Sequence, residues 1–306
     1  MDTQARVTVI MSTNRRSPYL AEALESVRAQ TVDAWEIVLL DNGSPVPDEI
    51  RAVAAGVPRC RVVREQGHVV SIPLNHGLAL ARSEYVTFLD DDDVWEPRRL
   101  EVLLDRLDAD PGLGGVYSSV DFIDGQGRRK GPLFVAADES PRDLLSGRYP
   151  FPNIVSFVFR RTDLIRVGGF NPAFRYAEDT DLTFRMLQYA RIEGVPEVLT
   201  LYRRHDDNVT AVRATALHDA SRRMIRMQSW GAENHADPTI AADIRANRRA
   251  LDARDAHDSV EHGLSSLRRG DVTGATRLLA RAARLDPGVA VREASRRIAR
   301  KARRGD

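Results

Sequence analysis

The sequence predicts an α/β protein with a mostly parallel sheet flanked by helices, followed by an α-helical C-terminal extension. Three observations support this prediction. Short apolar runs alternate with helix-like segments through the first two thirds of the chain. These runs are almost continuously apolar, as expected for strands that are buried on both faces. Beyond about residue 210, strand-forming residues become scarce and arginine becomes frequent.

The first half of the sequence alternates four predicted strands with helices. Ser17 and Pro18 fit the N-cap and the first helical position after the first strand, because serine accepts a backbone N–H and proline has none to satisfy. Pro73 likewise opens a helix that runs to Arg82. Residues 41–45 carry the turn formers that close the second strand. The four strands are Val7 to Met11, Glu36 to Leu40, Arg61 to Arg64 and Tyr85 to Leu89.

The next segment continues the pattern with less regular spacing. A helix from Pro97 to Asp108 precedes a strand from Val116 to Ile123, and Asp124 to Gly127 then form a hairpin-like turn. A further strand covers Ile154 to Phe159. The helix predicted from about Asp179 to Arg191 repeats apolar residues on one face, which we expect to be buried. These residues are Leu182, Met186 and Tyr189.

Composition narrows the class of protein. The chain has 306 residues and is 42% hydrophobic, which suits one α/β domain with an appendage. Its single cysteine, Cys60, excludes an internal disulfide framework and a multi-cysteine zinc site. No apolar stretch reaches the roughly 18 residues of a membrane span. The apolar run Val7 to Met11 is too short for a signal peptide, so we expect a cytoplasmic protein.

Charge is unevenly distributed along the chain. Residues 211–306 hold 20 Lys and Arg against 12 Asp and Glu, whereas residues 1–210 hold 25 against 32. This asymmetry predicts an acidic domain that carries the site and a basic helical extension. Within the extension, about 256–287 resembles one tetratricopeptide-type helix hairpin, although an ordinary hairpin also fits. The arginine-rich stretch Arg292 to Arg304 suits peripheral contact with anionic lipid, contact in a homodimer, or solvent alone.

Four consecutive aspartates, Asp90 to Asp93, follow directly on the apolar run Tyr85 to Leu89. Their charges repel one another unless a cation lies among them. A divalent cation carrying a diphosphate fits, because hard cations prefer carboxylate oxygen and ligands in open α/β sheets bind beyond the carboxyl ends of strands. An acidic solvated turn is the alternative. An EF-hand loop is disfavoured because Trp95 stands where the sixth loop position needs glycine.

Three further segments accompany the aspartates, and none is a glycine-rich phosphate loop. Residues 9–15 close the first strand and residues 38–44 close the second. Residues 168–171 (Gly-Gly-Phe-Asn) lead into residues 177–185, which contain Glu-Asp-Thr-Asp. In this order and spacing, the four segments resemble the family 2 glycosyltransferases of the GT-A fold, over about residues 5–210.

The resemblance implies a GT-A catalytic domain over residues 1–210, with a Rossmann-like nucleotide-binding half. It implies inverting transfer of a sugar from a nucleoside-diphosphate sugar to an acceptor hydroxyl. Mg²⁺ or Mn²⁺ would be the cofactor, with Asp92 and His205 as ligands, although His205 also fits a structural role. Asp179 matches the general base. The residues implied to contact the donor are Thr13, Arg15, Asp41, Asn75, Asp90 and Asp91.

Two of these roles have local alternatives. Asp41 matches the residue that binds the base, and a carboxylate suits the imide N–H of uracil or thymine, but it also fits an Asx turn. Asp179 lies near a predicted helix N-terminus, whose dipole favours the ionised form, and it also fits a plain N-cap. One departure weakens the donor's identity: Leu74 stands where relatives commonly carry arginine. A cationic contact to the donor is therefore missing or supplied elsewhere, with His76 and Arg82 as candidates.

The partners expected are a UDP- or dTDP-linked sugar and a glycan, lipid-linked or small-molecule acceptor, as in polysaccharide biosynthesis, with no nucleic acid. A sugar nucleotidyltransferase is one alternative, but it normally carries a glycine-rich loop after the first strand, and residues 12–17 contain no glycine. A non-catalytic scaffold with a degenerate domain is the other. The intact acidic set disfavours it.

Overall fold

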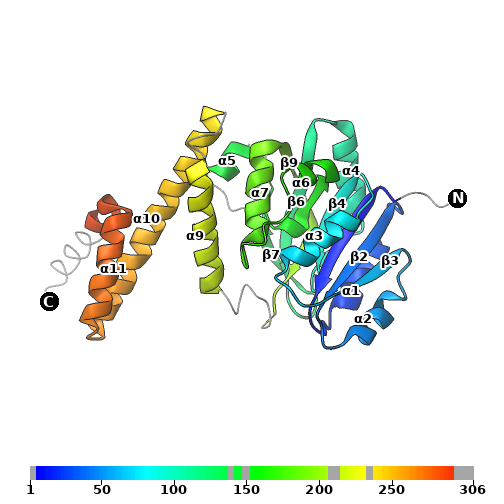
Figure 1. Cartoon of the computed structure of the whole chain (residues 1–306), viewed down its shortest axis with the longest axis horizontal. Helices are drawn as coiled ribbons and strands as arrows, with labels where there is room; N and C mark the ends of the chain where they lie inside the picture. Colours follow the sequence, from blue (N-terminus) through cyan, green and yellow to red (C-terminus); the bar gives the residue numbers. More distant parts are fainter. Residues whose placement is uncertain (1–4, 137–140, 147–151, 206–213, 232–236, 293–306) are drawn as a thin grey trace. The chain divides into compact units, whose positions relative to one another are not determined.

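The computed structural model describes residues 5–136, 141–146, 152–205, 214–231 and 237–292. The chain divides into two compact units, residues 1–224 and 225–306, and each is described by itself (Figure 1). The first unit carries a nine-stranded sheet and the second is helical. No helix in the described ranges combines the length and apolar character needed to cross a membrane.

Four parallel strands form the N-terminal half of the sheet, in the order β3-β2-β1-β4. Each alternates with a helix, as the apolar runs predict. Their register sets the position of the site, because Thr13 pairs with Asp41 and Ser12 pairs with Asp90. The carboxyl ends of β1, β2 and β4 therefore meet at one edge of the sheet. These strands are β1 (Val7–Thr13), β2 (Trp35–Asn42), β3 (Cys60–Glu65) and β4 (Tyr85–Asp90).

The sheet continues beyond β4 in the order β8-β6-β9-β5, with β7 also paired to β6. Here parallel and antiparallel pairs mix: β6 and β9 are parallel, whereas β8 runs antiparallel to both β4 and β6. The hairpin-like turn at Asp124 to Gly127 joins β6 to β7. These strands are β5 (Val94–Trp95), β6 (Leu113–Ile123), β7 (Arg129–Phe134), β8 (Phe157–Arg160) and β9 (Arg191–Arg203).

Helices pack on the sheet through side chains that alternate along the strands. Val9 and Met11 share a buried cluster with α1 and α4, while Ile10 meets α3. The approach of α3 requires glycine, because a Cβ on Gly77 would lie 2.5 Å from Ile10 Cγ2. The helices of this unit before α9 are α1 (Leu20–Arg28), α2 (Pro47–Ala54), α3 (Ser71–Leu80), α4 (Arg99–Ala109), α5 (Pro141–Leu145), α6 (Arg161–Arg166) and α7 (Glu178–Tyr189).

Several predicted boundaries shift for local reasons. α1 begins at Leu20 because Ser17 Oγ accepts the Tyr19 N–H and donates to the Asp91 carbonyl, which holds a separate turn ahead of the helix. Pro73 lies within the first turn of α3, where its missing N–H costs nothing. The strand predicted from Ile154 starts as a 3₁₀ turn, Ile154–Ser156.

Burial of the α7 face also differs from the prediction at one position. Leu182 and Met186 are buried as expected, whereas Tyr189 is 49% exposed. Tyr189 is the last helical residue, and β9 starts two residues later at Arg191. Its hydroxyl instead accepts a hydrogen bond from Arg166 Nη1 at 3.1 Å.

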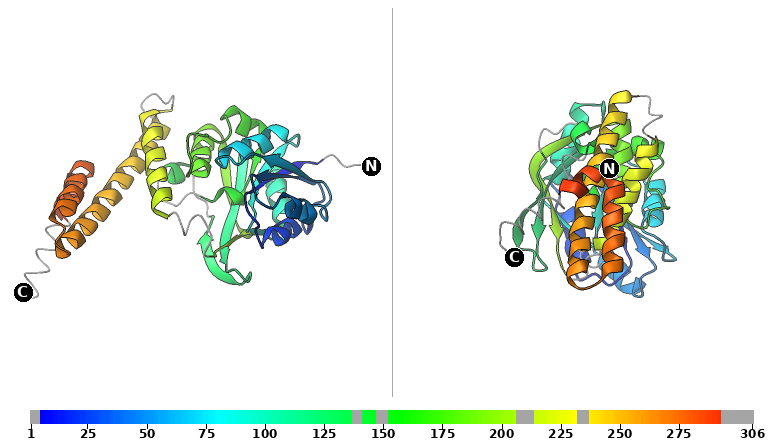
Figure 2. Two further views of the ribbon diagram at one scale, coloured as in Figure 1. Left: turned by 60° about the horizontal axis from the view of Figure 1, so that its bottom comes forward. Right: turned by 90° about the vertical axis from the view of Figure 1, so that its left-hand side faces the viewer.

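The second unit contains a helix hairpin of α10 (Pro238–Arg268) and α11 (Val272–Leu285), which run side by side (Figure 2). Ala256, Val260 and Ala282 form its buried centre. Gly270, with φ of +82°, makes the turn, and Asp271 caps α11 by accepting the Gly274 N–H at 2.8 Å. The remaining helix, α9 (Ala214–Gly231), extends across the boundary between the two units. A tetratricopeptide-type role for the hairpin stays a prediction.

Candidate active site

The four aspartates occupy the end of β4 and the turn that leads into β5. One carboxylate oxygen from each of Asp90, Asp92 and Asp93 lies within 4.8 Å of the others. Three oxygens at such separations can share a single divalent cation. Asp93 supports this use, because it is fully buried and its Oδ2 has no hydrogen-bond partner among the described residues. An unpartnered buried carboxylate oxygen needs a compensating group, so these residues fit a cation.

The electrostatics of the cluster indicate the same requirement. Loss of hydration within the cluster, and next the charges of Asp92 and Asp91, raise the pKa of Asp90 to about 8. Burial, and then Asp90, raise the pKa of Asp93 well above its usual range. A cation among these groups would reverse both shifts by favouring the charged carboxylates.

Asp91 and Asp92 receive contacts from two other segments of the sequence. Thr13 Oγ1 donates a short hydrogen bond to Asp91 Oδ2, and Arg15 Nη2 lies 3.1 Å from Asp92 Oδ2. His205 Nε2 lies 2.9 Å from the same Asp92 oxygen. The structure thus brings His205 to the same aspartates as Thr13 and Arg15, from which it is far removed in the sequence. Their assignment to donor or metal binding stays a prediction.

Arg203, the last residue of β9, holds the aspartate segment in place through hydrogen bonds. It is fully buried, its backbone N–H donates to Asp93 Oδ1 at 2.9 Å, and its Nε donates to the Asp92 carbonyl at 2.8 Å. Nη2 pairs with Glu22 at 2.7 Å, and the guanidinium lies 4.4 Å from the centre of the Tyr19 ring. The sequence gives no signal for this role, because Arg203 is one of many arginines and its contacts come from distant segments.

Asp41 lies at the end of β2 with both carboxylate oxygens engaged. Oδ1 accepts the Ser44 N–H at 3.0 Å, as in an Asx-type turn, and Oδ2 lies 2.5 Å from Arg64 Nη1. Burial alone would raise the pKa of Asp41, but the hydrogen bonds from Arg64 and Ser44 lower it. The carboxylate is therefore ionised at neutral pH and can only accept hydrogen bonds.

Asn75 has a structural role that the sequence did not reveal. Its Nδ2 donates to the Phe170 carbonyl at 2.7 Å and its Oδ1 accepts the Phe170 N–H at 2.8 Å. A Cβ on Gly169 would lie 2.5 Å from that Oδ1, so glycine is required there. Asn75 thus ties α3 to the segment that precedes α7, and its predicted contact with the donor stays a prediction.

Asp179 lies in the first turn of α7, after Ala177 in the left-handed conformation. Its Oδ1 accepts the Thr180 N–H at 2.6 Å. Burial nevertheless raises its pKa, which differs from the expectation that the helix dipole dominates. Burial, and next the charge of Asp179, raise the pKa of Glu178 to about 8. The charge of Asp179 also contributes to the raised pKa of Asp90. The carboxylate of Asp179, in the first turn of α7, therefore interacts electrostatically with the aspartate cluster.

Further charged residues near these segments have partners of their own. Asp181 is buried and pairs with Arg185 at 2.7 Å rather than facing solvent. His76, one candidate for the cation that Leu74 lacks, pairs with Glu65. Arg82, the other candidate, precedes β4 and therefore lies at the opposite end of that strand from Asp90, away from the aspartate cluster. Arg204 lies over the Phe122 ring at 3.6 Å. The basic stretch Arg292 to Arg304 falls almost entirely outside the described residues.

Comparison with known proteins assigns this arrangement to a family. The profile described as Glycosyl transferase family 2 matches residues 8–176, more than half of the chain. This range includes the ends of β1, β2 and β4 and stops three residues before Asp179.

Relatives and solved structures agree with the match. Protein y4gI of Sinorhizobium fredii is 31% identical over 76% of this chain, and the O-antigen biosynthesis protein RfbC of Myxococcus xanthus is 32% identical over 69%. The chain spans only 26% and 16% of the lengths of these two proteins. The structure of S. aureus TarS residues 1–349 in complex with UDP-GlcNAc aligns with a TM-score of 0.62, covering 91% of each chain at 15% identity, which shows the fold. The chain is therefore a glycosyltransferase that belongs to family 2.

Proposed function

We propose that this chain transfers a single sugar from a nucleoside-diphosphate sugar to an acceptor hydroxyl, with inversion at the anomeric carbon. The observation that carries the proposal is the strand register, which brings Thr13, Asp41 and the aspartate cluster to one edge of the sheet. Asp179 acts electrostatically on the same cluster from a different element. Such an arrangement of carboxylates can bind the donor through the aspartate cluster and activate an acceptor hydroxyl through Asp179.

The donor proposed is UDP- or dTDP-linked. The ionised Asp41 carboxylate suits the imide N–H of uracil or thymine, and Arg64 and Ser44 hold it in a fixed orientation. TarS, which shares the fold, was captured with UDP-GlcNAc. Thr13 and Arg15 lie beside Asp91 and Asp92, where the ribose and diphosphate would follow the base.

Asp90, Asp92 and Asp93 would hold Mg²⁺ or Mn²⁺, with His205 beside Asp92. Such an ion, when bound, neutralises charge that develops on the departing diphosphate. Asp179 accepts the proton of the acceptor hydroxyl as the oxygen attacks the anomeric carbon. Its raised pKa makes it a stronger base than an exposed aspartate. One base acting opposite the leaving group gives direct displacement and therefore inversion.

The acceptor proposed is a hydroxyl of a glycan or a lipid-linked glycan, in keeping with the name of RfbC. A cytoplasmic location, peripheral membrane contact through the basic end of the chain and a homodimer remain part of the proposal. The family assignment favours transfer of the sugar over synthesis of the nucleotide sugar.

The test is a donor screen followed by a turnover assay. Thermal unfolding of the full chain is measured with a panel of nucleoside-diphosphate sugars, each in MnCl₂ and in EDTA. We expect stabilisation by a uridine or thymidine donor that depends on Mn²⁺ and is lost in Asp92→Ala. Stabilisation by no donor, or stabilisation that EDTA leaves unchanged, contradicts the proposed site.

A further inference from the structure

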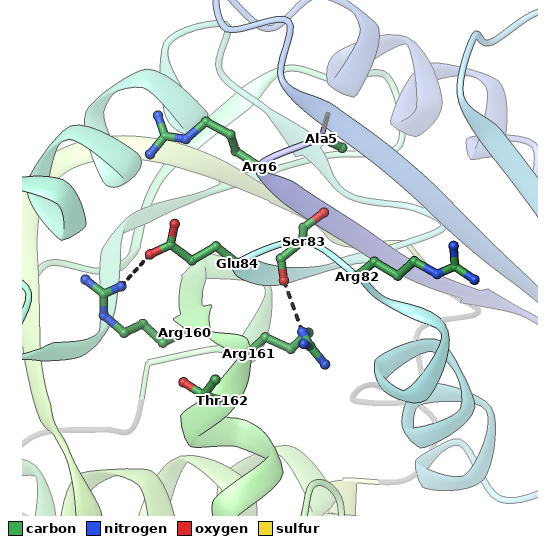
Figure 3. Close-up of a pocket in the computed structure, with 8 residues that line it drawn as sticks. All are labelled: Ala5, Arg6, Arg82, Ser83, Glu84, Arg160, Arg161 and Thr162. Carbon is green, nitrogen blue, oxygen red and sulfur yellow. Dashed lines mark hydrogen bonds and ion pairs between the residues drawn. The ribbon is translucent and has the colours of Figure 1, made fainter. Parts of the chain in front are cut away.

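A charged cavity lies apart from the aspartate cluster and has no part in the proposed reaction. It encloses about 500 Å³ (Figure 3). Four of its eight lining residues are arginines and one is a glutamate. The lining consists of Ala5, Arg6, Arg82, Ser83, Glu84, Arg160, Arg161 and Thr162.

The cavity belongs to the opposite edge of the sheet. Arg6 precedes β1 and Glu84 precedes β4, whereas the aspartates follow β4. Arg160 ends the antiparallel strand β8 and pairs in register with Tyr85, the first residue of β4. Because β4 spans six residues at about 3.3 Å each, roughly 20 Å separate the cavity from Asp90. One small ligand would not occupy both sites.

Two of the four arginines are neutralised by neighbouring carboxylates. Arg6 Nη2 lies 2.7 Å from Asp108, and Arg160 Nη1 lies 2.7 Å from Glu84. Arg160 also donates to the carbonyls of Leu113 and Leu107. These ion pairs hold the side chains of Arg6 and Arg160 in place and leave them little net positive charge with which to bind a ligand.

The other two arginines keep most of their donors available. Arg82 is exposed and makes no hydrogen bond or ion pair with the described residues. Among the described contacts, the Arg161 side chain donates only through Nε, to the Ser83 carbonyl at 3.1 Å. No carboxylate among the described residues pairs with either guanidinium. This excess positive charge stands out because residues 1–210 carry more acidic than basic residues overall.

We infer that this cavity binds a small phosphate-bearing ligand through Arg82 and Arg161. Guanidinium groups match phosphate oxygens with two parallel hydrogen bonds, and the volume is within the range of small-molecule sites. In the view of Figure 3, the guanidinium groups of Arg82 and Arg161 lie on one side and those of Arg6 and Arg160 on the other. Because two guanidinium groups are available, the site suits a diphosphate, or a ligand with two phosphate groups, better than a single phosphate.

The experiment measures binding of inorganic pyrophosphate to the full chain in EDTA by isothermal titration calorimetry at fixed ionic strength. Without a metal, the aspartate cluster repels phosphate, and the variants below separate binding in the cavity from binding to the basic extension. We expect saturable binding at one site. Citrate at equal ionic strength tests the ligand class, and citrate that binds as tightly as pyrophosphate contradicts a phosphate site.

The variants are Arg82→Gln alone and Arg82→Gln with Arg161→Gln. Arg82→Gln alters an exposed side chain, so it tests the site even if the double variant folds poorly. The matched control is Arg61→Gln with Arg249→Gln, which removes the same charge from exposed positions outside the cavity. Loss of charge-assisted hydrogen bonds should lower the affinity for pyrophosphate about tenfold or more in Arg82→Gln with Arg161→Gln, and less than about twofold in the control.

A lipid headgroup could supply the same phosphate chemistry, and a parallel measurement separates the two sources. Phosphatidylcholine vesicles containing phosphatidylglycerol are sedimented with the chain and with both double variants. Sedimentation that falls only in Arg82→Gln with Arg161→Gln assigns the phosphate to a lipid. The inference is overturned if neither pyrophosphate nor vesicles bind in a way that depends on Arg82 and Arg161.

Discussion

Replacing Arg203 tests whether the aspartate cluster is held in place from β9. In Arg203→Met, the Nε bond to the Asp92 carbonyl and the Nη1 bond to the Asp124 carbonyl at 3.2 Å are both lost. The Asp92 carbonyl is left unpaired, which costs about 1–3 kcal/mol of stability, whereas the Asp124 carbonyl keeps its hydrogen bond from the Gly127 N–H. The Glu22 pair adds little, because Glu22 is 52% exposed. The backbone bond from residue 203 to Asp93 remains.

Arg99 offers a matched control within the same unit. It is also fully buried, it donates to the carbonyls of Val155 and Phe157, and it lies 4.0 Å from the centre of the Trp95 ring. Arg99→Met should therefore cost a similar amount of stability. It touches none of the four aspartates in the described contacts, so it should leave their arrangement intact.

The assay compares two quantities in both variants. The free energy of unfolding is measured with urea, and the affinity for Mn²⁺ is measured by calorimetry at a temperature where each variant is folded. We expect both variants to lose stability but only Arg203→Met to lose Mn²⁺ affinity, by about tenfold or more. Arg203→Lys, which keeps one donor, should recover part of it. Equal Mn²⁺ affinities in Arg203→Met and Arg99→Met would refute the positioning role of Arg203.

Three further predictions follow from the site. Asp179→Asn should lower turnover by about 10²–10⁴-fold while the donor still binds, since only the proton acceptor is lost; turnover near the wild-type rate would remove Asp179 from this role. Asp93→Asn should raise the free energy of unfolding in EDTA, because a neutral amide replaces a buried carboxylate with a raised pKa, and it should weaken the binding of Mn²⁺. An increase, or a decrease, in both the free energy of unfolding and the Mn²⁺ affinity would contradict a ligand role. Glu178, whose pKa is raised to about 8, favours folding when protonated, so its contribution is present below about pH 4.5 and is lost as the pH rises through 8. In EDTA, Glu178→Gln should therefore lose less stability than the wild type between pH 5 and 8.5 in urea unfolding, and identical losses would count against the shift.

Local sequence patterns sufficed for much of the fold. The runs that became β1, β2 and β4 are largely apolar, and such patterns depend only on neighbouring residues. Helix boundaries differ from the prediction where a distant group makes a contact. The hydrogen bond from Ser17 to the Asp91 carbonyl, for example, makes α1 begin later than predicted. The weak turn at Ile154 and the short strand β5 carried too few residues for a periodic signal.

The sequence by itself determined which acids end the strands, because Asp41 and Asp90 directly follow apolar runs whose burial fixes their direction. Only the tertiary structure decided what surrounds them. Arg203 reaches Asp93 across 110 residues, and Asn75 reaches Phe170 across 95. Such contacts depend on strand order and on the close approach of α3 at Gly77, and neither is encoded in the spacing of residues along the chain. The physical reason is that burial and charge at a site are sums over segments that only folding brings together.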